Sequence, residues 1–350
     1  MASLYMGAAG AIWALEKLRG NGLADIAIDF APTIAGLLDH NRRFKEAVDF
    51  ASPSYFLGDA AVLLLQWKRL RDPAAADALF ALAEGNLHNP TLDALWGSSG
   101  TLIAVLHMFD DLRQPAQQQR WRDLLRRGAA ILLDRMHLVR HSAHPQTEAW
   151  LWTQDMYGKQ LDHLGVGHGF AGNVFPVVRR ARCALARCGA GGTFRRAGRA
   201  DTRHRGRTRR QRAQLAAVIR PRGARLPLQA DDAGLPRRAR HRLPPRRTKL
   251  ARSARVARHG GRSSLGCRTA CQTTGSVPRY ALLKLHAMTG EAHGLQRARA
   301  FAMHALEQSG AEARMHGALR FTLWTGDLGL ALYVSSCLRA DAAFPTLDVF

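Results

Sequence analysis

Apolar residues recur at helical spacing along most of the chain. In residues 75–87 and 118–133, apolar positions fall three and four residues apart, with polar residues between them. This pattern is typical of a helix that buries one face. Alternating stretches typical of half-buried strands are almost absent. We therefore predict an all-α fold, in which helices fill residues 1–178 and 276–350 and no β-sheet occurs in the first 178 residues.

A short glycine motif opens an apolar run at five places. The first copy, Gly7-Ala8-Ala9-Gly10, has two glycines three residues apart, which puts both on one helix face and allows another backbone or a ligand to approach closely. In the second copy, Ala61 replaces the second glycine. Each copy, with the amphipathic stretch between copies, predicts a helical hairpin with an outer and an inner helix. The copies lie in residues 3–10, 54–61, 95–100, 167–172 and 322–329.

Hairpins of this kind bury their apolar faces only against neighbouring hairpins, in an open α-solenoid or in a closed α/α ring. An open solenoid without an active site is an alternative that periodicity does not exclude. The motifs and their order, however, resemble those of the LanC-like family, the lanthionine synthetase C-like proteins. The resemblance covers residues 1–178 and about 272–350 and is closest at residues 3–15, 93–106, 167–175, 280–286 and 323–350.

The resemblance implies an α/α toroid (barrel) of seven helical hairpins, each inner helix being opened by a Gly-x-x-Gly motif. It assigns residues 1–178 to repeats one to four and residues 269–350 to repeats six and seven. Residues 179–268 stand where repeat five is expected, and that repeat is scrambled. Because the chain begins six residues before Gly7, the resemblance also implies a short N-terminus.

The family forms thioether rings in peptides. In it, one zinc ion held by two cysteines and one histidine presents the thiolate of a substrate cysteine, which adds to a dehydrated serine or threonine. This suits zinc, which prefers thiolate and imidazole ligands and keeps one position open in catalytic sites. The resemblance thus implies a dehydrated precursor peptide as substrate and a lantibiotic dehydratase as a candidate partner. A cyclase and another thiol-adding enzyme of the wider family are equally compatible with the sequence.

By resemblance, His168 and Asp93 are the residues that transfer protons. His168 stands in Gly167-His168-Gly169, like the histidine-glycine motif of the family, and Asp93 lies four residues before Gly97, where the family has its aspartate. Histidine is the side chain best suited to general acid or base work near neutral pH. Each residue has a structural alternative: His168 could hold a loop, and Asp93 could cap the helix that follows.

The zinc ligands implied by the resemblance are incomplete. Cys271 lies within one position of the cysteine expected before the sixth inner helix, but Gln272 stands where a histidine is expected. An amide is a poor zinc ligand, and an incidental cysteine is an equal alternative. We therefore expect zinc to be absent or weakly bound and the chain to lack cyclase activity, so that whether this chain is an enzyme stays uncertain.

The charge of the chain is concentrated in one segment. Residues 179–268 contain 27 Arg, 1 Lys, 3 Asp and no Glu, a net charge of +25, so the other 260 residues sum to −1 against a total of +24. An Arg-rich nucleic-acid-binding protein is therefore an alternative. Phe194 is the only aromatic residue in the segment, whereas single-strand binders combine basic grooves with aromatic side chains. We predict no specific nucleic-acid partner.

We hypothesise that this segment is translated out of frame. Reading the codons of residues 235–241 one base later allows Cys-His-Gly-Ala-Pro-Gly-Ile, the fifth-repeat motif of the family, with its cysteine overlapping Leu235. A GC-rich gene read out of frame also produces excess arginine. Two compensating frameshifts, one soon after Val178 and one near Cys271, would explain both features. Residues 190–265 should then be irregular, and resequencing of the gene tests the hypothesis.

Two further function classes remain. An α/α-toroid glycosidase needs two opposed carboxylates, and the motif loops offer Asp59, Asp93 and Asp327 without an obvious pair. A decayed gene product overlaps with the first interpretation. The sequence shows no signal peptide and no apolar stretch long enough to span a bilayer. We therefore predict a cytoplasmic protein with reduced thiols and no membrane span.

Overall fold

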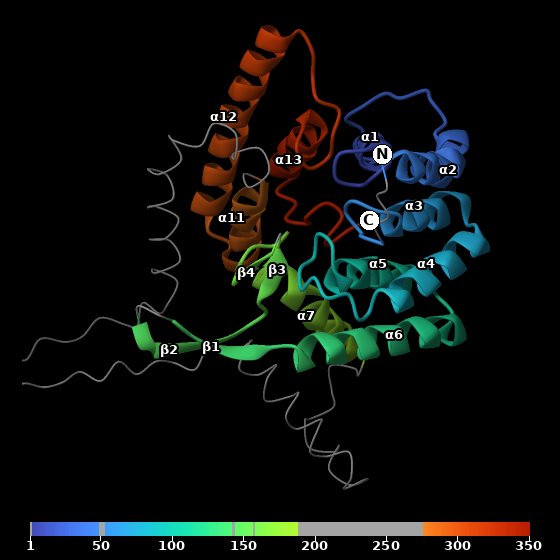
Figure 1. The fold of residues 1–350 in the computed structure, drawn as a ribbon. Coiled ribbons are helices and arrows are strands. Elements are labelled where there is room, and N and C mark those ends of the chain that lie inside the picture. Colours follow the sequence, from blue (N-terminus) through green and yellow to red (C-terminus); the bar gives the residue numbers. More distant parts are fainter. Residues whose placement is uncertain (1, 49–52, 142–143, 157, 188–275) are drawn as a thin grey trace, which may run out of the picture.

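The computed structural model describes residues 2–48, 53–141, 144–156, 158–187 and 276–350. Most of these residues are helical (Figure 1), so the prediction of a mainly α-helical protein is confirmed. The helices are α1 (Ala8–Gly20), α2 (Ala31–Val48), α3 (Ala60–Leu70), α4 (Pro73–Gly85), α5 (Ser98–Asp111), α6 (Pro115–Asp134), α7 (Phe170–Arg187), α11 (Ser276–Thr289), α12 (Ala292–His316) and α13 (Asp327–Arg339).

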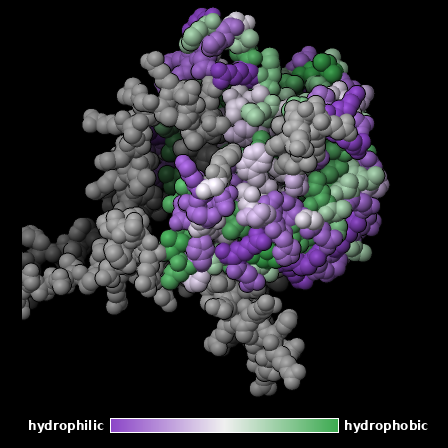
Figure 2. Space-filling model, in the orientation of Figure 1, coloured by the Kyte–Doolittle hydropathy of each residue, from purple (hydrophilic) through white to green (hydrophobic). Residues whose placement is uncertain are grey.

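Connecting helices alternate with the helices that the glycine motifs open. The connecting helices α2, α4, α6 and α12 each pack against both helices that they join. α6 shows why: Trp121, Leu124 and Leu125 are buried on one face, while Arg126 and Arg127 on the other are exposed. In the view of Figure 2, hydrophilic residues cover much of the lower right margin, where α4 and α6 lie. The amphipathic pattern predicted for residues 118–133 is thus observed.

The remaining helices pack side by side in the order α11, α13, α1, α3, α5, α7. The contact between α13 and α1 brings the last glycine motif next to the first. α7 and α11 are the two ends of this series, and among the described residues they share no extensive packing. The segment between them in the chain contains the residues predicted to be out of frame.

Hydrogen bonds join the loops that precede these helices. Trp324 N donates to Tyr5 O (3.2 Å), Tyr5 N to Phe56 O (2.9 Å), and Leu95 N to Gly167 O (3.0 Å). The Ser54 hydroxyl makes the remaining link by donating to Leu95 O. The loops of five motifs therefore form one hydrogen-bonded series. The backbone donors and acceptors occupy one equivalent position, two residues before Gly326, Gly7, Gly58, Gly97 and Gly169: they belong to Trp324, Tyr5, Phe56, Leu95 and Gly167.

The second glycine of the motif is required by a turn of backbone beneath it. A Cβ atom at Gly100 would overlap the carbonyl oxygen of Ala94, six residues earlier, and the same relation holds at Gly10, Gly172 and Gly329. In the second motif, which has Ala61 at this position, α3 begins two residues after Gly58, whereas α5 begins directly after Gly97. A later helix start therefore accompanies alanine at this position.

The prediction that helices alone fill the first 178 residues is wrong between α6 and α7. Here β1 (His137–His141) pairs antiparallel with β2 (His144–Leu151), and β3 (Gln154–Met156) pairs antiparallel with β4 (Lys159–Leu161). Gly158, at φ 74°, provides the turn between β3 and β4. Because the family resemblance implies helices alone in this part of the chain, these strands count against it. They form two-stranded hairpins in one connection and leave the order of the helices unchanged.

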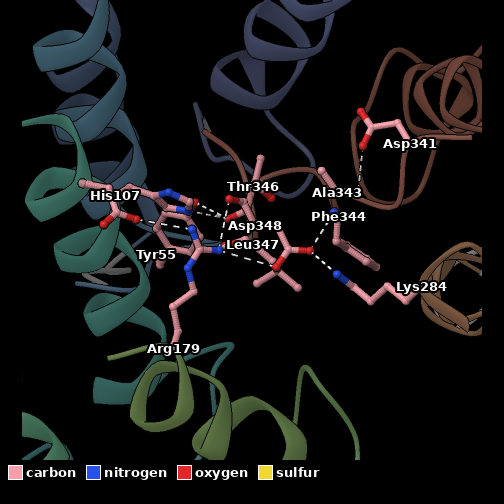
Figure 3. Close-up of polar contacts among 11 residues, drawn as sticks. Tyr55, His107, Arg179, Lys284, Asp341, Ala343, Phe344, Thr346, Leu347 and Asp348 are labelled. Carbon is pink, nitrogen blue, oxygen red and sulfur yellow. Dashed lines mark hydrogen bonds and ion pairs between the residues drawn. The ribbon is translucent and has the colours of Figure 1, made fainter. Parts of the chain in front are cut away.

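The C-terminal residues 340–350 lie among the helices that follow the glycine motifs (Figure 3). Thr346 O accepts hydrogen bonds from Tyr55 Oη (2.6 Å) and from His107 Nε2 (3.2 Å). Burial lowers the pKa of His107 to about 3, so its ring is neutral and can donate only from the nitrogen that carries hydrogen. Phe344 and Leu347 are buried beside these contacts.

α7 continues past residue 178, where the sequence predicts the end of the first domain. Arg179 donates to Leu347 O (3.3 Å) and Asp348 O (3.1 Å) of the C-terminal segment. Asp348 also pairs with Lys284 of α11 (Figure 3). The C-terminal segment therefore connects α7 and α11, the two helices that do not pack extensively against each other.

Candidate functional site

Asp93 and His168 meet where the third and fourth motif loops lie side by side. His168 Nδ1 and Asp93 Oδ2 are 2.6 Å apart. The Asp93 side chain is fully buried, whereas 36% of the His168 side chain is exposed. The structure thus brings together the two residues that the resemblance assigned to proton transfer. With Nδ1–H donated to the carboxylate, Nε2 is the ring nitrogen that can exchange a proton with a ligand.

Asp93 also shapes its own loop. Its Oδ1 accepts hydrogen bonds from Trp96 N (2.7 Å) and Gly97 N (3.3 Å). The alternative role of Asp93 as a cap of the helix is not observed, because Gly97 is the N-cap of α5 and Asp93 caps the turn before it. The two carboxylate oxygens have different partners: Oδ1 caps the turn, and Oδ2 contacts His168.

The backbone on both sides of His168 is held by the third motif loop. Gly167 O accepts hydrogen bonds from Ala94 N (3.1 Å) and Leu95 N (3.0 Å). Gly169 has φ 120°, and a Cβ at Gly172 would lie 2.8 Å from the Ala94 Cβ. The small residues around His168 therefore make room for neighbouring protein atoms. The expectation that they leave space for a ligand has no support at Gly169 and Gly172.

Two buried amides that the sequence did not single out support the same junction. Gln154 Nε2 (3.0 Å) and Asn173 Nδ2 (2.7 Å) both donate to the carbonyl of Leu92, the residue before Asp93. Both side chains are fully buried. Neither residue belongs to a Gly-x-x-Gly pair, and Gln154 lies in a strand where a helix was predicted, so no sequence signal pointed to them.

The predicted metal ligand Cys271 lies outside the described residues, as does Gln272 beside it. Within the part of the chain that the structure describes, no three His, Cys, Asp or Glu side chains form a group that could hold a metal ion. Cys337 is buried in α13, and burial raises the pKa of its thiol, which disfavours the thiolate that zinc needs.

The carboxylates of the second and last motifs, Asp59 and Asp327, accept hydrogen bonds from nearby protein groups. Asp59 Oδ1 accepts from Asn41 Nδ2 (2.9 Å), and Asp327 Oδ2 accepts from Arg320 N (2.6 Å). These contacts give both carboxylates structural partners, so they add no support to the glycosidase alternative.

No protein-family model matches the chain, and no curated protein matches it. Among the described residues, no helix combines the length and the apolar character needed to cross a membrane. Indications of function therefore come from the geometry of Asp93 and His168 and from the resemblance of the motifs.

Proposed function

We propose that the chain is a LanC-like protein that retains the proton-transfer pair of a lanthionine synthetase and lacks a complete zinc site. The observation that carries the proposal is the 2.6 Å contact between His168 Nδ1 and the buried Asp93 Oδ2. The two residues are 75 positions apart in the chain, each was predicted from its place beside or within a glycine motif, and they are in direct contact. Cytoplasmic location, a dehydrated peptide as substrate and a lantibiotic dehydratase as partner belong to the same proposal.

The fold that we propose is a seven-hairpin α/α toroid whose fifth repeat falls in the segment that we propose to be out of frame. In this arrangement α11, α13, α1, α3, α5 and α7 are six of the seven inner helices. The packing of α13 against α1 and the hydrogen-bonded series of motif loops support this order. The fifth inner helix would stand between α7 and α11. Because Arg179 packs against the C-terminal segment, the proposed change of frame would follow Arg179.

The reaction needs two proton transfers and no oxidant. A peptide cysteine loses its thiol proton, the sulfur bonds to the β-carbon of a dehydrated residue, and the resulting enolate accepts a proton at the α-carbon. His168 Nε2 is placed to accept the first proton or to deliver the second. Asp93 orients the ring through Nδ1, as a carboxylate does in other histidine pairs.

The described residues offer no ligand set for zinc, so none of these steps is assigned to a metal. A cysteine thiol near its ordinary pKa is mostly protonated at pH 7. Few substrate cysteines would therefore be thiolates beside the His168–Asp93 pair. No group would hold the sulfur and the β-carbon of the dehydrated residue in place. For this reason we propose that the chain as it stands does not close rings.

The test compares the chain with a frame-repaired variant, in which the codons between residues 179 and 271 are read in the alternative frame. Both are incubated with a dehydrated peptide, treated with a thiol-blocking reagent and analysed by mass spectrometry. Ring closure protects the thiol only with the repaired protein if the proposal holds. Protection by the unrepaired chain, or zinc bound tightly to it at one ion per chain, would show that other residues form the site.

A further inference from the structure

We propose that Gln154 is a positioning residue that holds the Asp93 loop and the His168 loop at a fixed separation. The inference deepens the proposed function, since it concerns the same pair of residues. Gln154 lies at the start of β3 and is fully buried. The hairpin that the sequence failed to predict thus brings a polar side chain to the base of the candidate site.

Every polar atom of the Gln154 amide is bonded to a different backbone group. Nε2 donates to Leu92 O (3.0 Å) and to Trp152 O (2.6 Å). Oε1 accepts from His163 N (2.9 Å). An amide offers donors and an acceptor together, whereas a carboxylate has no hydrogen to donate and an alkyl group has neither.

These contacts connect Gln154 to both members of the pair. On one side, Leu92 is bonded covalently to Asp93. On the other, His163 O accepts from Phe170 N (2.9 Å), so residues 163–170 form a closed loop that contains His168. The Nε2 and Oε1 atoms of one side chain thus hold the backbone where each of the two loops begins. A polar group buried without its partner is unfavourable, which opposes movement of either loop.

Asn173 supports Leu92 O from α7 on another side, with a donor distance of 2.7 Å. The ring of His163 lies 6.3 Å from that of His168 between centroids. Displacement of His163 N from Gln154 would therefore also disturb the ring next to His168. Gln154 has no contact with the proposed reacting atoms, and it acts only through these backbone groups.

The test observes the hydrogen bond itself in the full-length chain. With ¹⁵N-labelled histidine, the Nδ1–H proton that His168 donates to Asp93 should give a deshielded, slowly exchanging signal, and His168→Asn identifies it by its loss. Gln154→Glu removes the donor, and Gln154→Met removes both polar ends at similar volume. We expect both variants to lose this signal while their circular dichroism stays helical.

Two matched variants separate positioning from general damage. Gln118→Glu changes another buried glutamine whose Nε2 donates to two backbone carbonyls, those of Phe109 and Leu112. Gln160→Glu places the same charge on the exposed partner strand β4. Both should keep the His168 signal, although Gln118→Glu should lower stability. If Gln154→Met retains the signal unchanged, the proposal is overturned; if Gln154→Glu fails to fold, Gln154→Met decides. The signal requires neither zinc nor peptide, so failure of the repaired protein to close rings would leave this result intact.

Discussion

The second and third motif loops, residues 54–58 and 93–97, have a similar turn and differ in the side chain that caps it. Ser54 and Asp93 both stand four residues before the first glycine of their motifs. The Ser54 hydroxyl accepts from Phe56 N (3.1 Å) and Leu57 N (2.9 Å), as Asp93 Oδ1 accepts from Trp96 N and Gly97 N. Only Asp93 has a second oxygen, and that oxygen contacts His168.

This difference separates what the fold requires from what the site requires. A serine is enough to cap the turn, as Ser3 also shows by accepting from Met6 N (3.3 Å). Burying a carboxylate costs more than burying a hydroxyl unless the extra charge is paired. The second oxygen of Asp93 is therefore explained by His168 and not by the turn.

The largest effect is expected at the second glycine. Gly100→Ala should lower the free energy of unfolding by about 3 kcal/mol or prevent folding, because its Cβ would overlap Ala94 O. The second loop already has Ala61, so Ala61→Gly should cost only about 1 kcal/mol through added flexibility of the unfolded chain. Urea unfolding of both variants measures the contrast. Equal losses would mean that the later start of α3 does not accommodate alanine.

Removal of the capping side chains should separate the two loops. Asp93→Ala loses the cap and leaves the donors of its turn and His168 Nδ1 without their partner, and should cost about 2 kcal/mol. Ser54→Ala should cost about 1 kcal/mol and should leave the His168 signal unchanged. The measurements are urea unfolding and the ¹⁵N-histidine spectrum. A loss of the His168 signal in Ser54→Ala would show that the hydrogen bond from Ser54 to Leu95 O also positions His168.

A buried histidine provides a structural counterpart to His168. His107 has a folded-state pKa of about 3 because it is buried, against about 6.5 in the unfolded chain. Between these values the unfolded chain binds the extra proton, so stability falls as pH decreases below about 6.5. The chain should lose up to about 2 kcal/mol between pH 6.5 and pH 5 relative to His107→Gln. Parallel denaturation curves with the same pH dependence in both proteins would refute this.

The smallest effect is expected at a carboxylate that serves only the fold. Asp348 pairs with Arg179 and Lys284 at a partly exposed position. Asp348→Asn should therefore lower stability by about 1 kcal/mol or less, and added salt should reduce the difference. The His168 signal should not change. A large loss of that signal would show that the C-terminal segment also positions the candidate site.

The sequence predicted those features that repeat along the chain. Glycine motifs marked the starts of α1, α5, α7 and α13, and amphipathic spacing predicted α6. The β1–β4 hairpins were missed because they occur once, and because β3 and β4 have only three residues each. Asp93 and His168 were predicted because both are tied to a motif. Gln154 was not, because its partners are backbone atoms of Leu92, Trp152 and His163 that only the fold brings together.

The most direct test of the account replaces Asp93 by serine in the frame-repaired protein. Asp93→Ser keeps an oxygen that can cap the turn, as Ser54 does, and removes the oxygen that contacts His168. Zinc content, stability and the rate of ring closure are measured on the same preparation. We predict one zinc per chain, a loss of stability below about 1 kcal/mol and a fall in the rate of at least about 100-fold. An unchanged rate of ring closure would show that the contact between Asp93 and His168 has no part in the reaction.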